Sequence, residues 1–268
     1  MKKKFCIVTP TQKEKLSEYE KISLKTIQKN FKDVDKFLVT FLENKLELNN
    51  FKKVFFKKKH FDGIYSYNKL CMNADFYNKF NDYEYILICQ LDVIVLSKDF
   101  LKEIFKKKIS YIGAPAGKKN LFDRKRKKLW GRRFYCNGGF SLRNVEDFLR
   151  VLNSEKIQNP LNLITFIGCL KIGLLKYYKL LYYSSKQDKK SKIGYFLKNF
   201  NLNEDTFWSY FAIAFDNKFN LPSLEEANNF SFDGDPYFFY KKNLNKLPMA
   251  LHGHHNYLNF LEKIGKKI

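Results

Sequence analysis

The chain has 268 residues, of which 50 are Lys or Arg and 27 are Asp or Glu, so its formal net charge is +23. A hydrophobic content of 45% is normal for a globular protein and excludes a disordered chain. No uncharged apolar run approaches the length of about 18 residues that a membrane-spanning helix needs. The five cysteines are an odd number without C-x-x-C spacing, which disfavours a disulfide framework and a zinc ribbon.

The opening of the chain does not predict a secretory signal. Its basic start, residues 1–4, precedes an apolar run, residues 5–8, that ends before Thr9 and Pro10. A signal peptide needs an apolar region of about 7–15 residues. We therefore expect a cytoplasmic protein with reduced cysteines, folded as a single domain over residues 1–268.

The positive charge is compatible with three kinds of partner: a nucleic acid, an anionic membrane surface or a small phosphorylated substrate. Its densest run lies at 118–133, around Trp130, and two shorter lysine runs lie at 57–59 and 106–108. The chain is also rich in Lys, Asn, Ile, Phe and Tyr together, as AT-rich coding sequences are. Such a bias raises the charge without selecting a partner, so the charge alone does not choose among the three.

Short apolar runs alternate with helical periodicity along the first half of the chain. The strongest strand pattern, 85–89, is continuous and apolar, which is typical of a central parallel strand covered on both faces. The alternation predicts an α/β fold with a mixed, mostly parallel central sheet flanked by helices. The predicted strands are 5–9, 37–41, 54–56, 85–89, 109–114 and 140–143, and the predicted helices are 17–30, 67–80, 98–107 and 144–152.

Residues 157–200 interrupt this alternation and predict a helical insertion. Their apolar and aromatic part, 161–183, contains Lys171, Lys176 and Lys179, which makes it too charged to span a bilayer. One interpretation is a pair of helices packed on the domain or on a partner subunit. The other is a membrane-facing helix in the interface, where Lys and Tyr side chains reach headgroup depth.

Two features follow or precede predicted strands. Asp92 comes just after the strand 85–89 and so lies at the carboxyl edge of the sheet, where open α/β folds bind ligands; a turn cap is the simpler interpretation. Gly138 and Gly139, after Asn137, allow a ligand to approach the backbone closely or a positive φ. A plain tight turn explains this glycine pair equally well.

Two later clusters contain groups that catalyse reactions or bind metals. Glu204 and Asp205 open a helix, where they are either capping residues or, because neighbouring carboxylates perturb each other's pKa, a general base. Three of the four histidines, His252, His254 and His255, fall within four positions. A neutral imidazole among them could complete a metal shell begun by Asp92, but this spacing without cysteine does not make a structural zinc site, and a surface turn is an equal alternative.

Taken in order, six motifs resemble the DUF5672 family, which is associated with glycosyl transfer and a GT-A-like nucleotide-sugar-binding fold. The resemblance spans residues 67–255, with 156–200 outside it. The motifs are ILICQLD at 86–92, YIGAP at 111–115, NGGFSLR at 137–143, NEDTFW at 203–208, FSF at 230–232 and HGHH at 252–255.

The resemblance implies a metal site. Asp92 corresponds to the metal-binding acid of the GT-A "DxD" element, in which Gln90 replaces the first acid and Leu91 lies between them. The missing acid makes His252 or His254 more important as a second ligand. The implied metal is Mn²⁺ or Mg²⁺, which bridges the donor diphosphate and acts as a Lewis acid.

The resemblance also implies how a nucleotide sugar is held and used. Asn137, Gly138 and Gly139 border the donor sugar and the acceptor, and Gln90 and Leu91 lie beside the donor. Asp205, with Glu204 beside it, corresponds to the catalytic base of inverting enzymes. The first strand contacts the nucleoside through Val8, Thr9 and Pro10.

The implied protein transfers a sugar from a nucleotide-sugar donor, with UDP as the expected nucleotide, to a glycan or lipid-linked saccharide in bacterial surface-polysaccharide synthesis. We expect it in the cytoplasm or peripherally on the inner face of the membrane, where basic residues contact anionic lipid. Nucleic acid is not an expected partner, because C₂H₂ spacing, an RNP-like run and basic heptads are missing from the sequence.

Two alternatives remain. A basic nucleic-acid-binding protein gains support from the charge and from the 18% aromatic content, since aromatic rings can stack on bases. A catalytically inactive relative that binds sugar nucleotides gains support from Gln90 in place of an acid. Salt-sensitive binding of an oligonucleotide would favour the first, and donor binding without turnover would favour the second.

Overall fold

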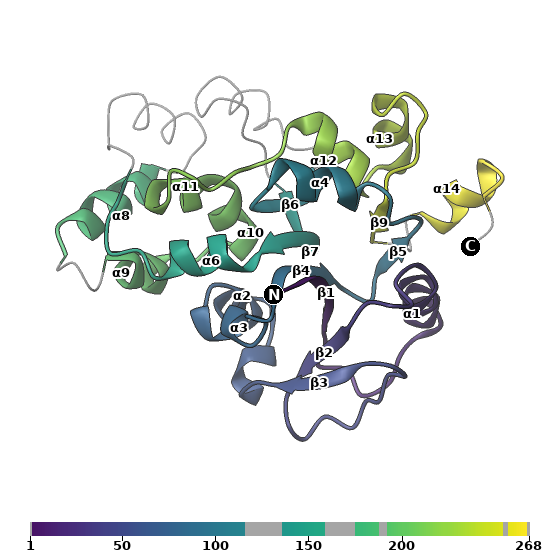
Figure 1. Cartoon of the computed structure of the whole chain (residues 1–268), viewed down its shortest axis with the longest axis horizontal. Coiled ribbons are helices and arrows are strands. Elements are labelled where there is room, and N and C mark those ends of the chain that lie inside the picture. Colours follow the sequence, from purple (N-terminus) through teal and green to yellow (C-terminus); the bar gives the residue numbers. More distant parts are fainter. Residues whose placement is uncertain (1, 116–135, 159–174, 188–191, 254–256, 267–268) are drawn as a thin grey trace.

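A six-stranded sheet forms the centre of the computed structural model, which describes residues 2–115, 136–158, 175–187, 192–253 and 257–266 (Figure 1). The first four strands in spatial order are parallel to one another, whereas the fifth is antiparallel to both of its neighbours. The α/β class and the mostly parallel sheet flanked by helices are therefore confirmed. In spatial order the strands are β3 (Lys52–Phe55), β2 (Lys36–Thr40), β1 (Lys3–Pro10), β4 (Tyr83–Cys89), β7 (Cys136–Asn144) and β6 (Tyr111–Pro115).

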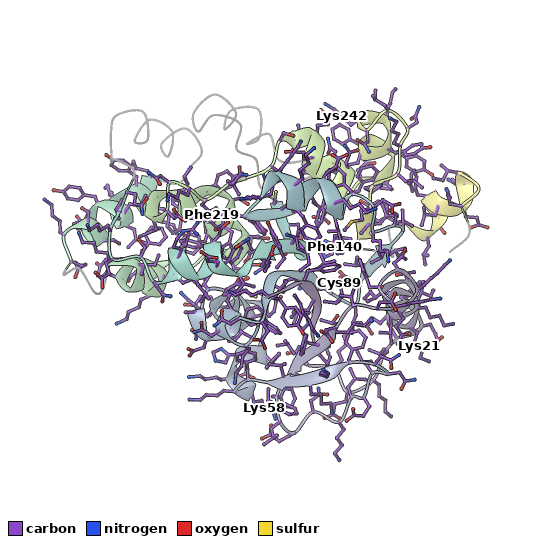
Figure 2. All side chains as sticks on the ribbon, in the orientation of Figure 1. Lys21, Lys58, Cys89, Phe140, Phe219 and Lys242 are labelled. Carbon is purple, nitrogen blue, oxygen red and sulfur yellow. The ribbon has the colours of Figure 1, made fainter. Side chains whose placement is uncertain are left out.

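The burial of each strand follows its sequence. The continuous apolar run of β4 is central, and its neighbour β1 pairs with it from Lys3 to Val8. The lysine-rich β3 lies at one edge, where its side chains reach solvent. Figure 2 shows Lys21, Lys58 and Lys242 at the outside of the molecule, whereas Cys89 and Phe140 lie inside. The labelled lysines are thus surface residues, whereas the sheet itself buries the charged side chains of Lys36 and Arg143.

Two hydrophobic layers cover the two faces of the sheet. Alternate residues of β1 and β4 point into different layers, because strand side chains alternate between faces. One layer contains helices α2 (Ile64–Cys71), α3 (Ala74–Asn78) and α6 (Val145–Leu152), and the other contains α1 (Glu18–Asn30), α4 (Leu101–Lys107) and α12 (Leu224–Phe230).

The prediction of one helix over 67–80 is wrong, because the chain forms two helices there. The side chain of Asn73 accepts a hydrogen bond from the backbone N–H of Asp75 and so caps α3. An asparagine in this role starts a new helix, which interrupts the old one. A short 3₁₀ turn, Lys58–Phe61, precedes α2.

A second sheet of three short strands lies beside the first. Its order is β5 (Val93–Val95), β9 (Ala250–His252) and β8 (Ser231–Asp233). Helices α13 (Pro236–Lys242) and α14 (Leu258–Lys263) pack on it through a separate apolar cluster. This sheet joins the chain directly after β4 to two segments that are far away in the sequence, and it positions the candidate site.

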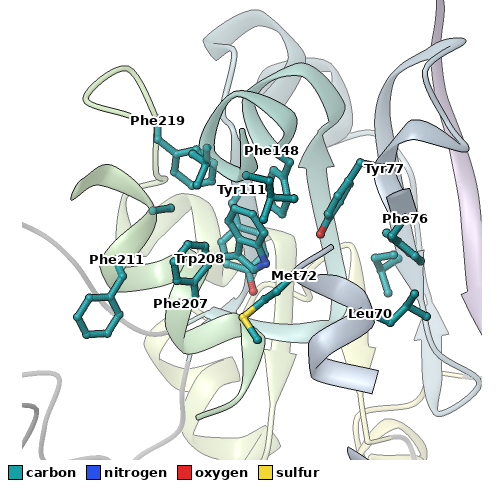
Figure 3. Close-up of a cluster of buried hydrophobic side chains, with 14 of the residues drawn as sticks. Leu70, Met72, Phe76, Tyr77, Tyr111, Phe148, Phe207, Trp208, Phe211 and Phe219 are labelled. Carbon is teal, nitrogen blue, oxygen red and sulfur yellow. The ribbon is translucent and has the colours of Figure 1, made fainter. Parts of the chain in front are cut away.

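The described part of the insertion consists of α8 (Leu175–Ser185) and α9 (Lys192–Asn199), which contact each other and the main core. No described helix is both long and apolar enough to cross a membrane. The following helix begins as α10 (Glu204–Thr206), passes through a π-helical turn at Phe207–Phe211 and ends as α11 (Ala212–Phe215). Figure 3 shows Trp208 of this turn beside Phe148, Tyr111 and Phe207 in the core.

Candidate active site

The two sheets bring Asp92 and His252 together. Asp92 follows β4 and immediately precedes β5, whose Val93 pairs with His252 of β9. The backbone N–H of Gly253 also donates to the carbonyl of Asp92 (2.9 Å). On the other side of β9, Asp233 at the end of β8 pairs with His252. Two acids therefore flank one histidine at the carboxyl edge of the central sheet.

The His252 ring lies between these two carboxylates. Its Nδ1 is 3.3 Å from Asp233 Oδ1, and its Nε2 is 3.5 Å from Asp92 Oδ1. Burial lowers the pKa of His252, but Asp233 and Asp92 outweigh burial and raise that pKa to about 10. The imidazole is thus held in one orientation, with Nδ1 towards Asp233 and Nε2 towards Asp92.

Asn137 and Gly139 belong to the same site. Asn137 Nδ2 donates to Asp233 Oδ2 (3.1 Å), and the N–H of Gly139 donates to Asn137 Oδ1 (2.7 Å). A Cβ on Gly139 would come within 2.3 Å of His252 Nε2 and 2.6 Å of Gln90 Oε1. Only glycine fits beside these two atoms, so the His252 and Gln90 side chains pack directly on the backbone of Gly139, which we call the glycine floor of the site.

Glu204 is buried beside the other glycine of the pair, Gly138. Its Oε1 is 2.7 Å from the Arg143 guanidinium, and a Cβ on Gly138 would come within 2.2 Å of the same oxygen. Arg143 also donates to Ser141 Oγ, Tyr77 Oη and the Gly138 carbonyl. Burial raises the pKa of the Glu204 carboxyl, and the Arg143 guanidinium opposes that rise.

The neighbouring acid, Asp205, is also buried. Its Oδ1 accepts a hydrogen bond from the N–H of Thr206 (2.8 Å). Burial raises the pKa of Tyr111 most, and the Glu204 and Asp205 carboxylates raise it further. Both carboxylates therefore lie near the Tyr111 phenol. The two adjacent acids therefore have different partners: Glu204 pairs with Arg143, and Asp205 accepts a hydrogen bond from the backbone of Thr206.

The residues predicted to contact the nucleoside lie at the end of β1. Val8 pairs with Ile88 of β4, so Pro10 reaches the same level as Gln90 at the carboxyl edge. The side chains of Val8 and Thr9 are fully buried, whereas Pro10 is partly exposed. Leu91 is also buried. A ligand at this edge would therefore meet the backbone of β1 and the ring of Pro10.

Sequence reasoning missed Asp233 and Arg143. The signal for Asp233 was its position directly after the FSF motif, because an acid after a short apolar run follows the same pattern as Asp92. Arg143 lies in a strand pattern in which a buried charge is not expected. His254 lies outside the described residues, so of the predicted histidine ligands only His252 is placed.

A protein family described as "Protein of unknown function (DUF5672)" matches residues 50–252. The chain belongs to the DUF5672 family. The matched region contains Asp92, Gly139, Asp233 and His252, and its match confirms the resemblance found in the sequence. No curated protein matches the chain.

Solved structures of glycosyltransferases are similar to the DUF5672 chain. The galactosyltransferase LgtC in complex with donor and acceptor sugar analogs is 14% identical, with 92% of this chain and 86% of that chain covered and a TM-score of 0.46. Mouse xyloside xylosyltransferase 1 in its apo form is 12% identical, with 94% and 98% covered and a TM-score of 0.47.

The Asp92 and His252 side chains of the DUF5672 chain fit a divalent cation. Two ligand atoms bound to one Mg²⁺ at about 2.0–2.1 Å lie roughly 3 Å apart in octahedral geometry, and Asp92 Oδ1 and His252 Nε2 are 3.5 Å apart. His252 would bind a metal through Nε2 while its Nδ1–H donates to Asp233, so the cation would have to displace the proton that the raised pKa of His252 keeps on Nε2. In the described part of the chain no group of three or more His, Cys, Asp and Glu surrounds a common metal position.

Proposed function

We propose that this protein is a glycosyltransferase that moves a sugar from a nucleotide-sugar donor to a hydroxyl of an acceptor. The observation that carries the proposal is the cluster of Asp92, His252 and Asp233 beside the backbone of Gly139, at the carboxyl edge of β4. A carboxylate and an oriented imidazole suit a cation that binds a diphosphate, and a glycine floor leaves space for a sugar.

Asp92 and His252 hold the cation in this proposal, and Asp233 orients His252. Bound there, Mn²⁺ or Mg²⁺ would neutralise the donor diphosphate and the nucleotide diphosphate that departs. Asn137 links Asp233 to Gly139 by two hydrogen bonds, so the cation ligands and the sugar floor are aligned with each other.

Asp205 is the general base. It takes the proton from the acceptor hydroxyl as that oxygen attacks the anomeric carbon and the phosphate departs, which inverts the configuration. Glu204 does not share this role, because its carboxylate is buried against Arg143 and Gly138. We assign Glu204 and Arg143 to positioning: they connect the helix that bears Asp205 to the strand that bears the glycine pair.

The donor in this proposal is a UDP-sugar whose nucleoside lies at the end of β1, against Pro10 and the backbone of Val8 and Thr9. The acceptor is a glycan or lipid-linked saccharide of bacterial surface-polysaccharide synthesis. The positive charge of the chain suits both polyanions and the anionic inner face of the cytoplasmic membrane, where we place the protein.

A thermal-shift screen tests the donor site. The purified protein is heated with UDP-, GDP-, CMP- and dTDP-sugars, each with Mn²⁺ or EDTA. A ligand at 100 times its Kd adds about 2.7 kcal/mol to the free energy of unfolding, so the Tm rises by degrees. We expect one nucleotide class to raise the Tm with Mn²⁺ and EDTA to abolish that increase. Asp92→Ala should abolish the increase as well and should lower the turnover rate about 10³-fold.

Asp82→Ala is the matched control for Asp92→Ala. Asp82 is an exposed acid just before β4, at the opposite edge of the sheet, so its removal should leave the donor shift unchanged. Equal shifts in wild type and Asp92→Ala would contradict the metal assignment. The lack of any shift, with and without candidate acceptors, would contradict the proposed function.

Gln90 favours a second candidate function, an inactive relative that binds nucleotide sugars. Its amide lies against Gly139 where a second acid would strengthen the cation site. Product analysis with the donor that raises the Tm separates the two functions: release of the nucleotide diphosphate supports the enzyme, and stable binding without release supports the inactive relative.

A further inference from the structure

A hollow separate from the candidate active site lies at the β3 edge of the central sheet. Its volume is about 880 Å³, within the range of about 300–1,000 Å³ that is usual for ligand pockets. One wall is the segment after β3 and the other is α3 with its flanking residues. Its lining includes Lys57, Lys59, Lys79, Phe55, Asn73 and Asp75.

Three lysines give this hollow its positive charge. Lys57, Lys59 and Lys79 are exposed, and none forms an ion pair within the described residues. The positive potential of these lysines acts on His60 in the same wall. Burial lowers the pKa of His60 most, and Lys59 and Lys57 lower it further. Unneutralised charges around a concave surface concentrate the field and attract anions.

The remaining lining groups indicate what kind of anion fits. Phe55 is 42% exposed and offers an apolar surface at the rim. Asn73 and Asp75 add amide and carboxylate groups, which can bond to hydroxyls. A carboxylate in the wall repels a continuous polyphosphate, and one exposed ring does not make the series of stacking platforms that single-stranded nucleic acid uses. A chain rich in hydroxyls with spaced negative charges satisfies all of these groups.

One end of the hollow, formed by Phe55 and Phe56, lies where the strands reach their carboxyl ends, as the candidate active site does. Phe55 and Cys89 end the parallel strands β3 and β4, which are separated by β1 and β2. Three steps of about 4.8 Å between neighbouring strands place the two strand ends roughly 14 Å apart. One extended saccharide chain can therefore reach from the hollow towards the site.

We propose that this hollow binds an acidic saccharide chain and holds the acceptor for transfer. The inference deepens the proposed function and rests on it, since it names the acceptor class. The carboxylates of the saccharide bind Lys57, Lys59 and Lys79, its hydroxyls bind Asn73 and Asp75, and a sugar face covers Phe55.

Calorimetric titration with hexagalacturonate, compared with neutral maltohexaose, tests this site. Lys57→Gln/Lys59→Gln/Lys79→Gln should weaken hexagalacturonate binding at least about tenfold at physiological salt, because three close charges are lost. The control Lys25→Gln/Lys29→Gln/Lys32→Gln removes the same charge from exposed lysines on and just after α1, and should change the affinity less than about twofold. Maltohexaose should bind weakly to all three proteins.

The outcomes separate this inference from the proposed function. The donor-induced thermal shift, measured in parallel, should be the same in the pocket variant and in wild type. A retained donor shift with equal loss of hexagalacturonate binding in both triple variants would overturn the inference and leave the proposed function intact. Loss of hexagalacturonate binding in Asp92→Ala would place the saccharide at the active site, and equal binding of an oligothymidylate with the same lysine dependence would indicate nucleic acid; either would overturn the inference.

Discussion

Two clusters of ionisable side chains meet at the glycine pair. In the first, the side chains of Asp92 and Asp233 are 40% and 28% exposed and flank His252. In the second, Glu204 and Arg143 are 4% and 0% exposed and bind each other. The chemistry is similar, but access differs. The carboxylates of this open cluster are accessible to a ligand, whereas the buried cluster can only hold the backbone in place.

The buried cluster shows how the open one is supported. Arg143 binds the carbonyl of Gly138 while Glu204 packs against the Cα of the same glycine. Ser209, in the π-helical turn that follows Glu204, accepts a hydrogen bond from the N–H of Cys136 at the start of β7 (3.0 Å). The helix that bears Asp205 is thus fastened to the strand that bears the floor of the site, and we expect the two clusters to respond to mutation in opposite ways.

The largest effect is expected from Arg143→Met, and it concerns stability. The substitution leaves the Glu204 charge buried without its partner, which costs about 3–5 kcal/mol in comparable cases. Urea denaturation followed by circular dichroism measures the loss. Lys4→Met is the control, since Lys4 and Glu84 form an exposed pair worth at most about 1 kcal/mol. Similar losses in both variants would show that the Arg143 pair has no structural role.

Asp205→Asn should act on turnover and leave the fold unchanged. Loss of a positioned general base lowers the rate by roughly 10²-fold or more. The donor-induced thermal shift should persist, because Asp205 does not hold the donor in the proposed mechanism. Glu204→Gln should instead lower the Tm. If Glu204→Gln lowers turnover at an unchanged Tm while Asp205→Asn is active, the base has been assigned to the wrong neighbour.

Asp233→Asn should weaken metal binding by about 10–100-fold, since a carboxylate behind a histidine ligand sets the orientation and basicity of the ring. Mn²⁺ titration followed by calorimetry measures this change without any substrate. Asp235→Asn is a close control two residues further on. Asp235 caps α13 through the N–H of Phe238, and asparagine caps a helix equally well. Equal Mn²⁺ affinity in both variants would remove Asp233 from the site.

The open cluster was largely accessible to sequence reasoning because its members follow local patterns. Asp92 comes after an unmistakable buried strand, and Gly138 and Gly139 stand out beside Asn137. The α/β class followed in the same way from the alternation of strands and helices. Such signals depend on neighbours in the chain, and the physics of a strand end applies wherever it occurs.

The pairings between distant residues could not be predicted in this way. The Arg143–Glu204 pair joins residues 61 apart, and the His252–Asp233 contact joins residues 19 apart. Both depend on the register of β8 and β9 and on where a helix packs against β7, which no local pattern specifies. The different environments of Glu204 and Asp205 could not be predicted for the same reason, because they arise only when the chain is folded.

Gln90→Glu has the smallest expected effect of these substitutions, and we expect it to increase the affinity of the open cluster for Mn²⁺. Gln90 Oε1 and His252 Nε2 both lie against Gly139, so a glutamate there adds a carboxylate to the open cluster. A unit charge about 4 Å from another contributes about 1 kcal/mol in water, which is roughly a fivefold change in affinity. Mn²⁺ should therefore bind more tightly by at least this factor, and Asp92→Ala in the same background should recover part of its lost binding.

The buried cluster allows no such gain in affinity, because a further charge beside Glu204 would be desolvated without a partner. An unchanged Mn²⁺ affinity in Gln90→Glu would mean that the cation does not lie between Asp92 and His252.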